Sequence, residues 1–174
     1  MVPIEVIVQD CFVATTPSAI IATAKFPYPI STSTWESWFY QWLEALKADL
    51  PPANAYELTL RLTGDPEIQS LNAQYRAQNR PTDVLAFAAL EVNAPELPIQ
   101  MQQSVPLYLG DVVISVDTAY RQAQQQQHPL LTELAWLASH GLLHLLGWDH
   151  PDEESLTKML DQQKILLRIV ELAV

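Results

Sequence analysis

The stretch LGDVVISV (residues 109–116) is a β-branched run, of the kind that suits a strand covered on both faces of a sheet. Helical patterns follow it without a further strand, over about 117–127, 131–146 and 152–172. The C-terminal half of the chain is therefore predicted to be helical.

Upstream of this run, strand patterns alternate with helical ones. The clearest strand is predicted over 56–63, where apolar and polar side chains alternate. A helix over 65–77 follows, with Ile68, Leu71 and Tyr75 on its predicted inner face. The other predicted elements are strands over 4–9 and 84–90, a helix over 35–50, an irregular insert over 10–34 and a long loop over 91–108.

The order of these elements favours one α+β domain spanning residues 1–174. A small mixed sheet of about four strands would be packed by about five helices. A chain of 174 residues is long enough to bury a substantial core without disulfides.

The composition of the chain indicates its compartment. Cys11 is the only cysteine, which excludes an internal disulfide framework and is typical of a reducing environment. The N-terminus lacks the basic region of a secretory signal. The longest apolar stretch, 130–148, contains Glu133, Ser139 and two histidines, so a buried core helix is predicted there instead of a membrane span. We expect a cytoplasmic protein that does not enter a membrane.

Three of the four histidines stand in HGLLHLLGWDH (residues 140–150). His140 and His144 are four residues apart, so a helix places both imidazoles on one face. His150 follows Gly147, where a helix can end in a left-handed turn that returns the chain toward the first two histidines. Three converging neutral imidazoles describe a site for one divalent ion with a position left open for water or substrate. Such ligands suit zinc, nickel or copper.

The same histidine spacing occurs in metzincin proteases, which need a glutamate directly after the first histidine as general base. Here that position is Gly141, so a peptidase loses its base and becomes the weaker alternative. A hydrolase could still act if the ion activates a water and polarises the substrate. Asp149 could orient an imidazole or assist a proton transfer, or it could simply bind backbone amides in its turn.

A second group of polar residues lies in LNAQYR (71–76) and RPTDVL (80–85). Arg76 ends a predicted helix, where its guanidinium group could clamp a phosphate through two hydrogen bonds. From the local sequence alone, a solvated surface arginine is the simpler interpretation, and Asp83 could simply cap the turn before its strand.

Together these segments closely resemble the YbeY family. The histidine run, the LNAQYR…RPTDVLAF segment, LGDVVIS (109–115) and the last helix with Met159 and Gln162 occur in the family's order. The resemblance covers about residues 56–168. It implies a metal-dependent, single-strand-specific endoribonuclease that acts in ribosomal RNA maturation and ribosome quality control.

The resemblance also assigns site residues and partners. It implies that His140, His144 and His150 hold a zinc-like ion, with His140 serving catalysis, and that Arg76 serves catalysis or binds RNA phosphate. Arg80 is a further candidate for substrate binding. The partners would be ribosomal RNA, and ribosomal proteins or small-subunit assembly factors. Two alternatives stay open: a non-catalytic ribosome-assembly factor with a structural metal, and a metalloprotease-like hydrolase.

The charge of the chain is the main difficulty for an RNA-cleaving enzyme. The formal net charge of −11 argues against an indiscriminate nucleic-acid binder, because neutralising phosphates requires a basic surface. For a metallo-hydrolase acting on RNA we therefore expect a basic or neutral strip near Arg76 and Arg80 beside the metal, with acids on the far surface. An acidic rim would favour protein partners over direct RNA binding.

Overall fold

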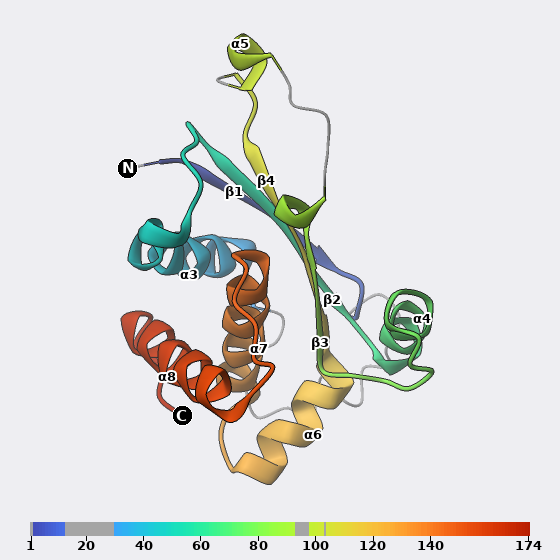
Figure 1. Ribbon diagram of the computed structural model, residues 1–174. Helices are drawn as coiled ribbons and strands as arrows, with labels where there is room; N and C mark the ends of the chain where they lie inside the picture. The colour runs from blue at the N-terminus through green and yellow to red at the C-terminus, as the bar shows by residue number, and fades with distance from the viewer. Residues whose placement is uncertain (1, 13–29, 93–97, 103) are drawn as a thin grey trace.

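A four-stranded mixed sheet forms the centre of the computed structural model, which describes residues 2–12, 30–92, 98–102 and 104–174 (Figure 1). Its strand order is β1-β2-β4-β3. The first three of these strands run parallel, and β3 pairs antiparallel with β4 at one edge. The strands are β1 (Ile4–Asp10), β2 (Tyr56–Thr63), β3 (Val84–Ala88) and β4 (Leu107–Ser115).

Helices cover both faces of this sheet (Figure 1). Helix α7 packs on β3 and β4, α3 packs on β1, and α8 packs against α7 and α3, whereas α4 lies on the opposite face against β4. The predicted single α+β domain with a helical C-terminal half is confirmed. The helical segments are α3 (Thr32–Ala45), η1 (Lys47–Asp49), α4 (Asp65–Arg76), η2 (Ala89–Glu91), α5 (Ile99–Gln102), α6 (Val116–Gln126), α7 (Leu130–Leu145) and α8 (Glu153–Ile169).

Strand β4 is buried on both sides, as its sequence predicts. Val112 and Ile114 belong to the main core under α7. Val113 points the other way and packs with Ile68 and Leu85 in a small cluster beneath α4. Alternate side chains of one strand therefore join two separate cores, which requires apolar residues at successive positions.

Several element boundaries differ from the sequence-based expectations. Helix α3 begins at Thr32, since the Ser31 hydroxyl accepts a hydrogen bond from the Thr34 backbone N–H and caps the helix. Asp10 belongs to β1, so the predicted irregular insert over 10–34 is wrong at both ends. The central part of that prediction, residues 13–29, lies outside the described residues.

The predicted loop over 91–108 also contains regular structure. The one-turn helix α5 lies within it, and β4 begins at Leu107. At the other end of β4, Val116 begins helix α6 instead of ending the strand. The Ser115 hydroxyl accepts a hydrogen bond from the Thr118 backbone N–H and so caps α6 one residue earlier than predicted.

Helix α7 is a buried core helix, as predicted, and it approaches the sheet very closely at Gly141. A Cβ atom added to Gly141 would lie 2.5 Å from Cγ1 of Val112, so only glycine fits between this helix and β4. The contact fixes the distance between α7 and β4 at this point. Within the parts of the chain that the structure describes, no helix combines the length and apolarity needed to cross a membrane.

Helices α3 and α8 are joined by an aromatic cluster. Trp38 and Trp42 pack with their neighbours on α3, and both are buried. The indole N–H of Trp42 donates a hydrogen bond of 2.9 Å to the Leu166 carbonyl on α8, 124 residues further along the chain. The N-terminal and C-terminal parts of the described chain therefore share one core.

Candidate metal centre

The three histidines of the 140–150 run meet at one point in the structure. Their ligand atoms all lie within 4.8 Å of one another, so they could hold a metal ion. His140 and His144 project from the same face of α7, with their Nε2 atoms 3.0 Å apart. The ring centroid of His150 lies 5.5 Å from that of His140 and 5.3 Å from that of His144. The spacing of the sequence predicted this convergence.

A turn at the end of α7 brings His150 back to the helix. Gly147 adopts the left-handed conformation, with φ of 90°, in which a side chain would be strained. Its N–H donates to the His144 carbonyl, and the Trp148 N–H donates to the Leu143 carbonyl. These two bonds form a Schellman motif, which ends the helix and reverses the chain. The indole N–H of Trp148 also donates to Asp49, at 3.3 Å, and links this loop to η1.

The orientation of His140 is fixed by Gln163 of α8, a fully buried polar residue. The Nε2 atom of Gln163 donates a hydrogen bond of 3.2 Å to the Trp136 carbonyl. Its Oε1 atom therefore faces His140 Nδ1, at 3.0 Å, and accepts the proton that this nitrogen carries. In that tautomer the His140 Nε2 atom presents a lone pair toward the other two histidines, which is the state a metal requires.

Burial keeps two of the imidazoles uncharged. It lowers the pKa of His140, and the nearby His150 adds to that effect, although the hydrogen bond with Gln163 opposes it. The pKa of His144 falls to about 4, first because of burial and then because His140 and His150 lie beside it. Both rings are neutral at neutral pH, so a metal ion does not have to displace protons from them.

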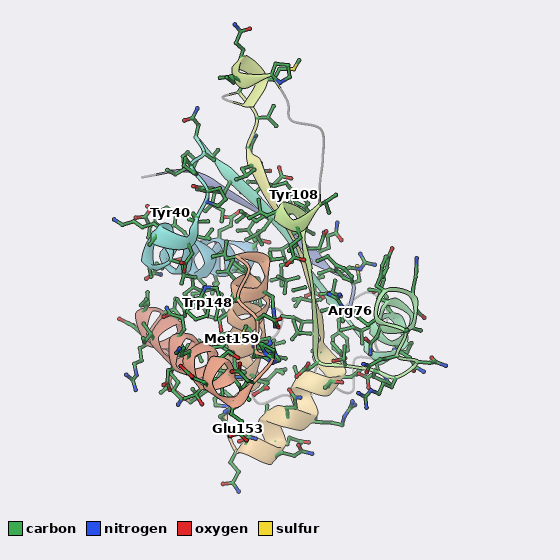
Figure 2. All side chains as sticks on the ribbon, in the orientation of Figure 1. Tyr40, Arg76, Tyr108, Trp148, Glu153 and Met159 are labelled. Atoms are coloured by element: carbon green, nitrogen blue, oxygen red, sulfur yellow. The ribbon has the colours of Figure 1, made fainter. Side chains whose placement is uncertain are left out.

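The histidines line an open cleft of about 1020 Å³ between α7 and the free edge of β3. Arg76, at the end of α4, reaches the cleft from the side opposite Trp148 (Figure 2). One guanidinium nitrogen of Arg76 donates a hydrogen bond of 2.9 Å to the Ala86 carbonyl of β3. Its Cζ atom also lies 5.8 Å from the ring centroid of Phe87. The arginine is therefore held over the strand that forms one wall of the cleft.

The structure places the other two predicted site residues differently from each other, and neither holds an imidazole. Arg80 does not line the cleft, and its guanidinium group donates to Gln78 Oε1 on the surface. Asp149 lines the cleft, but its carboxylate accepts a hydrogen bond from the His150 backbone N–H, at 2.8 Å. The interpretation of Asp149 as a turn residue is thus the one that matches its contact. Gln163, and not Asp149, holds an imidazole.

The predicted basic or neutral strip beside the histidines is wrong. Four carboxylates line the cleft, from Asp83, Glu91, Asp111 and Asp149, against the single guanidinium group of Arg76. One of these carboxylates has a structural role: Asp83 accepts a hydrogen bond from the Val84 backbone N–H and another from Gln122, and the second bond ties the start of β3 to α6.

Position 141 is closed to the glutamate that a metzincin would carry. Gly141 faces Val112 of the sheet and not the cleft. A side chain there would meet β4 and could not reach an ion held by the histidines. Among the described residues, the group that could hold a metal contains the three histidines and no carboxylate.

We expect Gln163→Leu to weaken metal binding by about 10- to 100-fold, because His140 would lose the acceptor that fixes its tautomer. The variant keeps much of the side-chain volume, so the helix packing should persist. Chelator competition measures the affinity, and ¹⁵N NMR of the metal-free protein reports which His140 nitrogen carries the proton. Gln162→Leu is the matched control on the same helix. Unchanged affinity in Gln163→Leu would show that the hydrogen bond does not serve the metal.

The comparisons with known proteins agree on one family. A family model described as Endoribonuclease YbeY matches residues 21–171. A Trichormus variabilis protein named Endoribonuclease YbeY is 60% identical over 170 residues, covering 98% of this chain and 96% of the relative. A Nostoc protein of the same name is 59% identical over 170 residues, covering 98% of this chain and 91% of the relative.

A solved structure supports the fold independently. The solution structure of TM1509 from Thermotoga maritima matches with a TM-score of 0.54, covering 95% of this chain and 89% of that one. The two sequences are 21% identical, so the similarity concerns the arrangement of helices and strands alone.

Proposed function

The chain belongs to the Endoribonuclease YbeY family, and from that premise we propose that it is a metal-dependent endoribonuclease whose ion is held by His140, His144 and His150. The observation that carries the proposal is the number of protein ligands at the site, which leaves one coordination position of the ion open. The described residues offer three imidazoles and no fourth protein ligand beside them, and the group faces a cleft. A structural metal site is closed by a fourth protein ligand, whereas a catalytic site leaves that position to water or substrate.

Three neutral imidazoles in a shell with an open position fit zinc best, and nickel would also fit. Such an ion, when bound, supplies Lewis-acid chemistry at a phosphoryl oxygen and lowers the pKa of a water. The work of the protein is to orient the ligands. Gln163 holds His140 in the productive tautomer, and the Schellman turn holds His150. We assign His140 to catalysis as a ligand of that ion, and its buried partner Gln163 fixes the orientation of the ring.

Arg76 is the residue proposed to act on the phosphate. Among the described residues it has no carboxylate partner within salt-bridge distance, so its positive charge is available to an anion in the cleft. The Ala86 carbonyl holds one of its nitrogens and leaves other N–H groups for a phosphoryl oxygen. Guanidinium groups placed in this way stabilise the charge that develops in phosphoryl transfer. Arg80 would contact RNA only outside the cleft.

The substrate proposed is single-stranded ribosomal RNA, in the cytoplasm, during ribosomal RNA maturation and ribosome quality control. Ribosomal proteins or small-subunit assembly factors are the proposed protein partners. The acidic lining of the cleft is consistent with a role for protein partners, since a partner could supply the basic surface that the described lining of the cleft lacks.

Cleavage of a structured RNA with a single-stranded end tests the proposal. We expect the metal-loaded wild type to cleave the single-stranded end and a chelator to abolish the reaction. Arg76→Ala should lower the maximal rate by about 100-fold or more, because one transition-state donor is lost, while metal content stays unchanged. Arg76→Lys keeps the charge without the planar fork and should recover only part of the rate. Equal activity in all preparations would indicate a contaminating nuclease and would contradict the proposal.

A further inference from the structure

An exposed aromatic residue lies beside the proposed phosphate ligand. Tyr75 precedes Arg76 on α4, and 56% of its surface is exposed. Tyr75 shares the predicted face of the helix with Ile68 and Leu71, but unlike them it lies outside the small core and keeps most of its surface exposed. The Tyr75 ring contacts Phe87 edge-on, with centroids 5.2 Å apart and planes at 70°.

Phe87 connects this tyrosine with the cleft. It is on β3, lines the same cleft as the three histidines, and lies under the Arg76 guanidinium group. Tyr75, Phe87 and Arg76 therefore form one aromatic and cationic cluster, in which the rings meet edge-on and the tyrosine stays open to solvent. We call these three residues the Tyr75 cluster.

The acidic charge of the cleft means that RNA binding there needs a source of affinity other than phosphate neutralisation. Proteins bind nucleic acid chiefly by neutralising phosphates, but here four carboxylates line the cleft and Arg76 is the only arginine or lysine among its described lining residues. The electrostatic attraction between this cleft and the phosphate backbone of RNA must therefore be weak. The remaining source of affinity for a single strand is stacking of bases on aromatic side chains and on arginine planes.

We propose that the Tyr75 cluster is a nucleobase subsite, in which Tyr75 stacks an unpaired base of the strand whose phosphate Arg76 contacts. The proposal rests on the proposed ribonuclease function and extends it to substrate selection. A paired base has both faces covered by its neighbours in the duplex, so it cannot reach the tyrosine without unstacking. The subsite therefore selects single-stranded RNA without reading its sequence.

Binding is the primary test, and it does not depend on cleavage. The probe is a short unstructured 2′-O-methyl RNA with a fluorescent label, titrated with the metal-loaded full chain and followed by anisotropy. We expect Tyr75→Leu to weaken binding by about tenfold, the effect of losing one base–aromatic stack. Tyr75→Phe keeps the ring and should bind as the wild type does. Gln74→Ala, on the neighbouring exposed position of α4, is the control, and thermal unfolding verifies the fold of each variant.

An RNA with a single abasic nucleotide separates stacking from a general loss of packing. Abasic substitution at one position should weaken the wild type by about tenfold and have little effect on Tyr75→Leu, because both changes remove the same contact. Annealing the probe to its complement should abolish the difference between wild type and Tyr75→Leu.

The outcomes distinguish the two proposals. Equal affinity of the wild type and Tyr75→Leu for the single strand would overturn the base subsite. Cleavage of the unmodified strand is measured in parallel. A wild type that binds through Tyr75 but never cleaves would overturn the ribonuclease and leave the subsite standing.

Discussion

His144→Ala is expected to abolish both metal binding and RNA cleavage while leaving the chain folded. His144 supplies one of only three imidazoles in the candidate site, and no carboxylate among the described residues can replace it. Two remaining histidines are a poor site for a catalytic ion, which takes three protein ligands. The imidazole is half-buried and borders the open cleft, so its loss removes little core packing.

Metal analysis and the RNA assay, carried out on the same preparation, measure this effect. The wild type should contain about one ion per chain and His144→Ala none. Arg76→Ala is the control that separates ligand loss from loss of catalysis, because it should keep the ion and still cleave slowly. A His144→Ala protein that retains both ion and activity would place the metal elsewhere in the molecule.

Gly141→Glu should prevent folding and should not create a peptidase. The substitution restores the glutamate of the metzincin pattern, but the side chain would enter the contact between α7 and β4. Its Cβ atom alone would meet Val112 at 2.5 Å, and a carboxylate buried there would have no partner. Overpacking and an unpaired buried charge together are expected to cost more than about 4 kcal/mol of the free energy of unfolding.

Chemical denaturation of variants with smaller substitutions tests whether the contact with Val112 causes this loss of stability. Gly141→Ala adds only the clashing Cβ atom and should be less stable than the wild type, although alanine favours a helix. In a Val112→Ala background the same change should cost much less, because the two methyl groups that it meets are gone. Equal costs in the two backgrounds would show that the glycine is not there for this contact. Soluble, stable Gly141→Glu would contradict the whole argument.

The sequence predicted those parts of the fold and site that depend on local patterns. The β-branched run gave β4, buried on both faces, and the i, i+4 histidines followed by Gly147 gave the convergence of three imidazoles. These predictions succeed because helix periodicity, strand alternation and left-handed glycine turns are set by neighbouring residues.

The features that the sequence did not predict depend on contacts between segments that are far apart along the chain. Gln163 lies on α8 with no local sign of its contact to His140, and neighbouring Gln162 was the residue that the family pattern suggested. The acidic cleft arises where η2, β3, β4 and the 147–150 loop meet, so a count of charges along the chain could not place it. The spacing of Gln163 four residues after Met159 was the one available signal; it indicates a place on the core face of the helix but does not identify His140 as its partner.

The bond between Trp42 and Leu166 also has a consequence for how the protein is made. Because the two residues are 124 positions apart, the tryptophan face of α3 emerges from the ribosome long before α8 is synthesised to cover it. Until then the nascent chain exposes a broad apolar surface, of the kind that binds chaperones or associates with other chains. The core around α3 is therefore complete only once α8 has been synthesised and has packed against it.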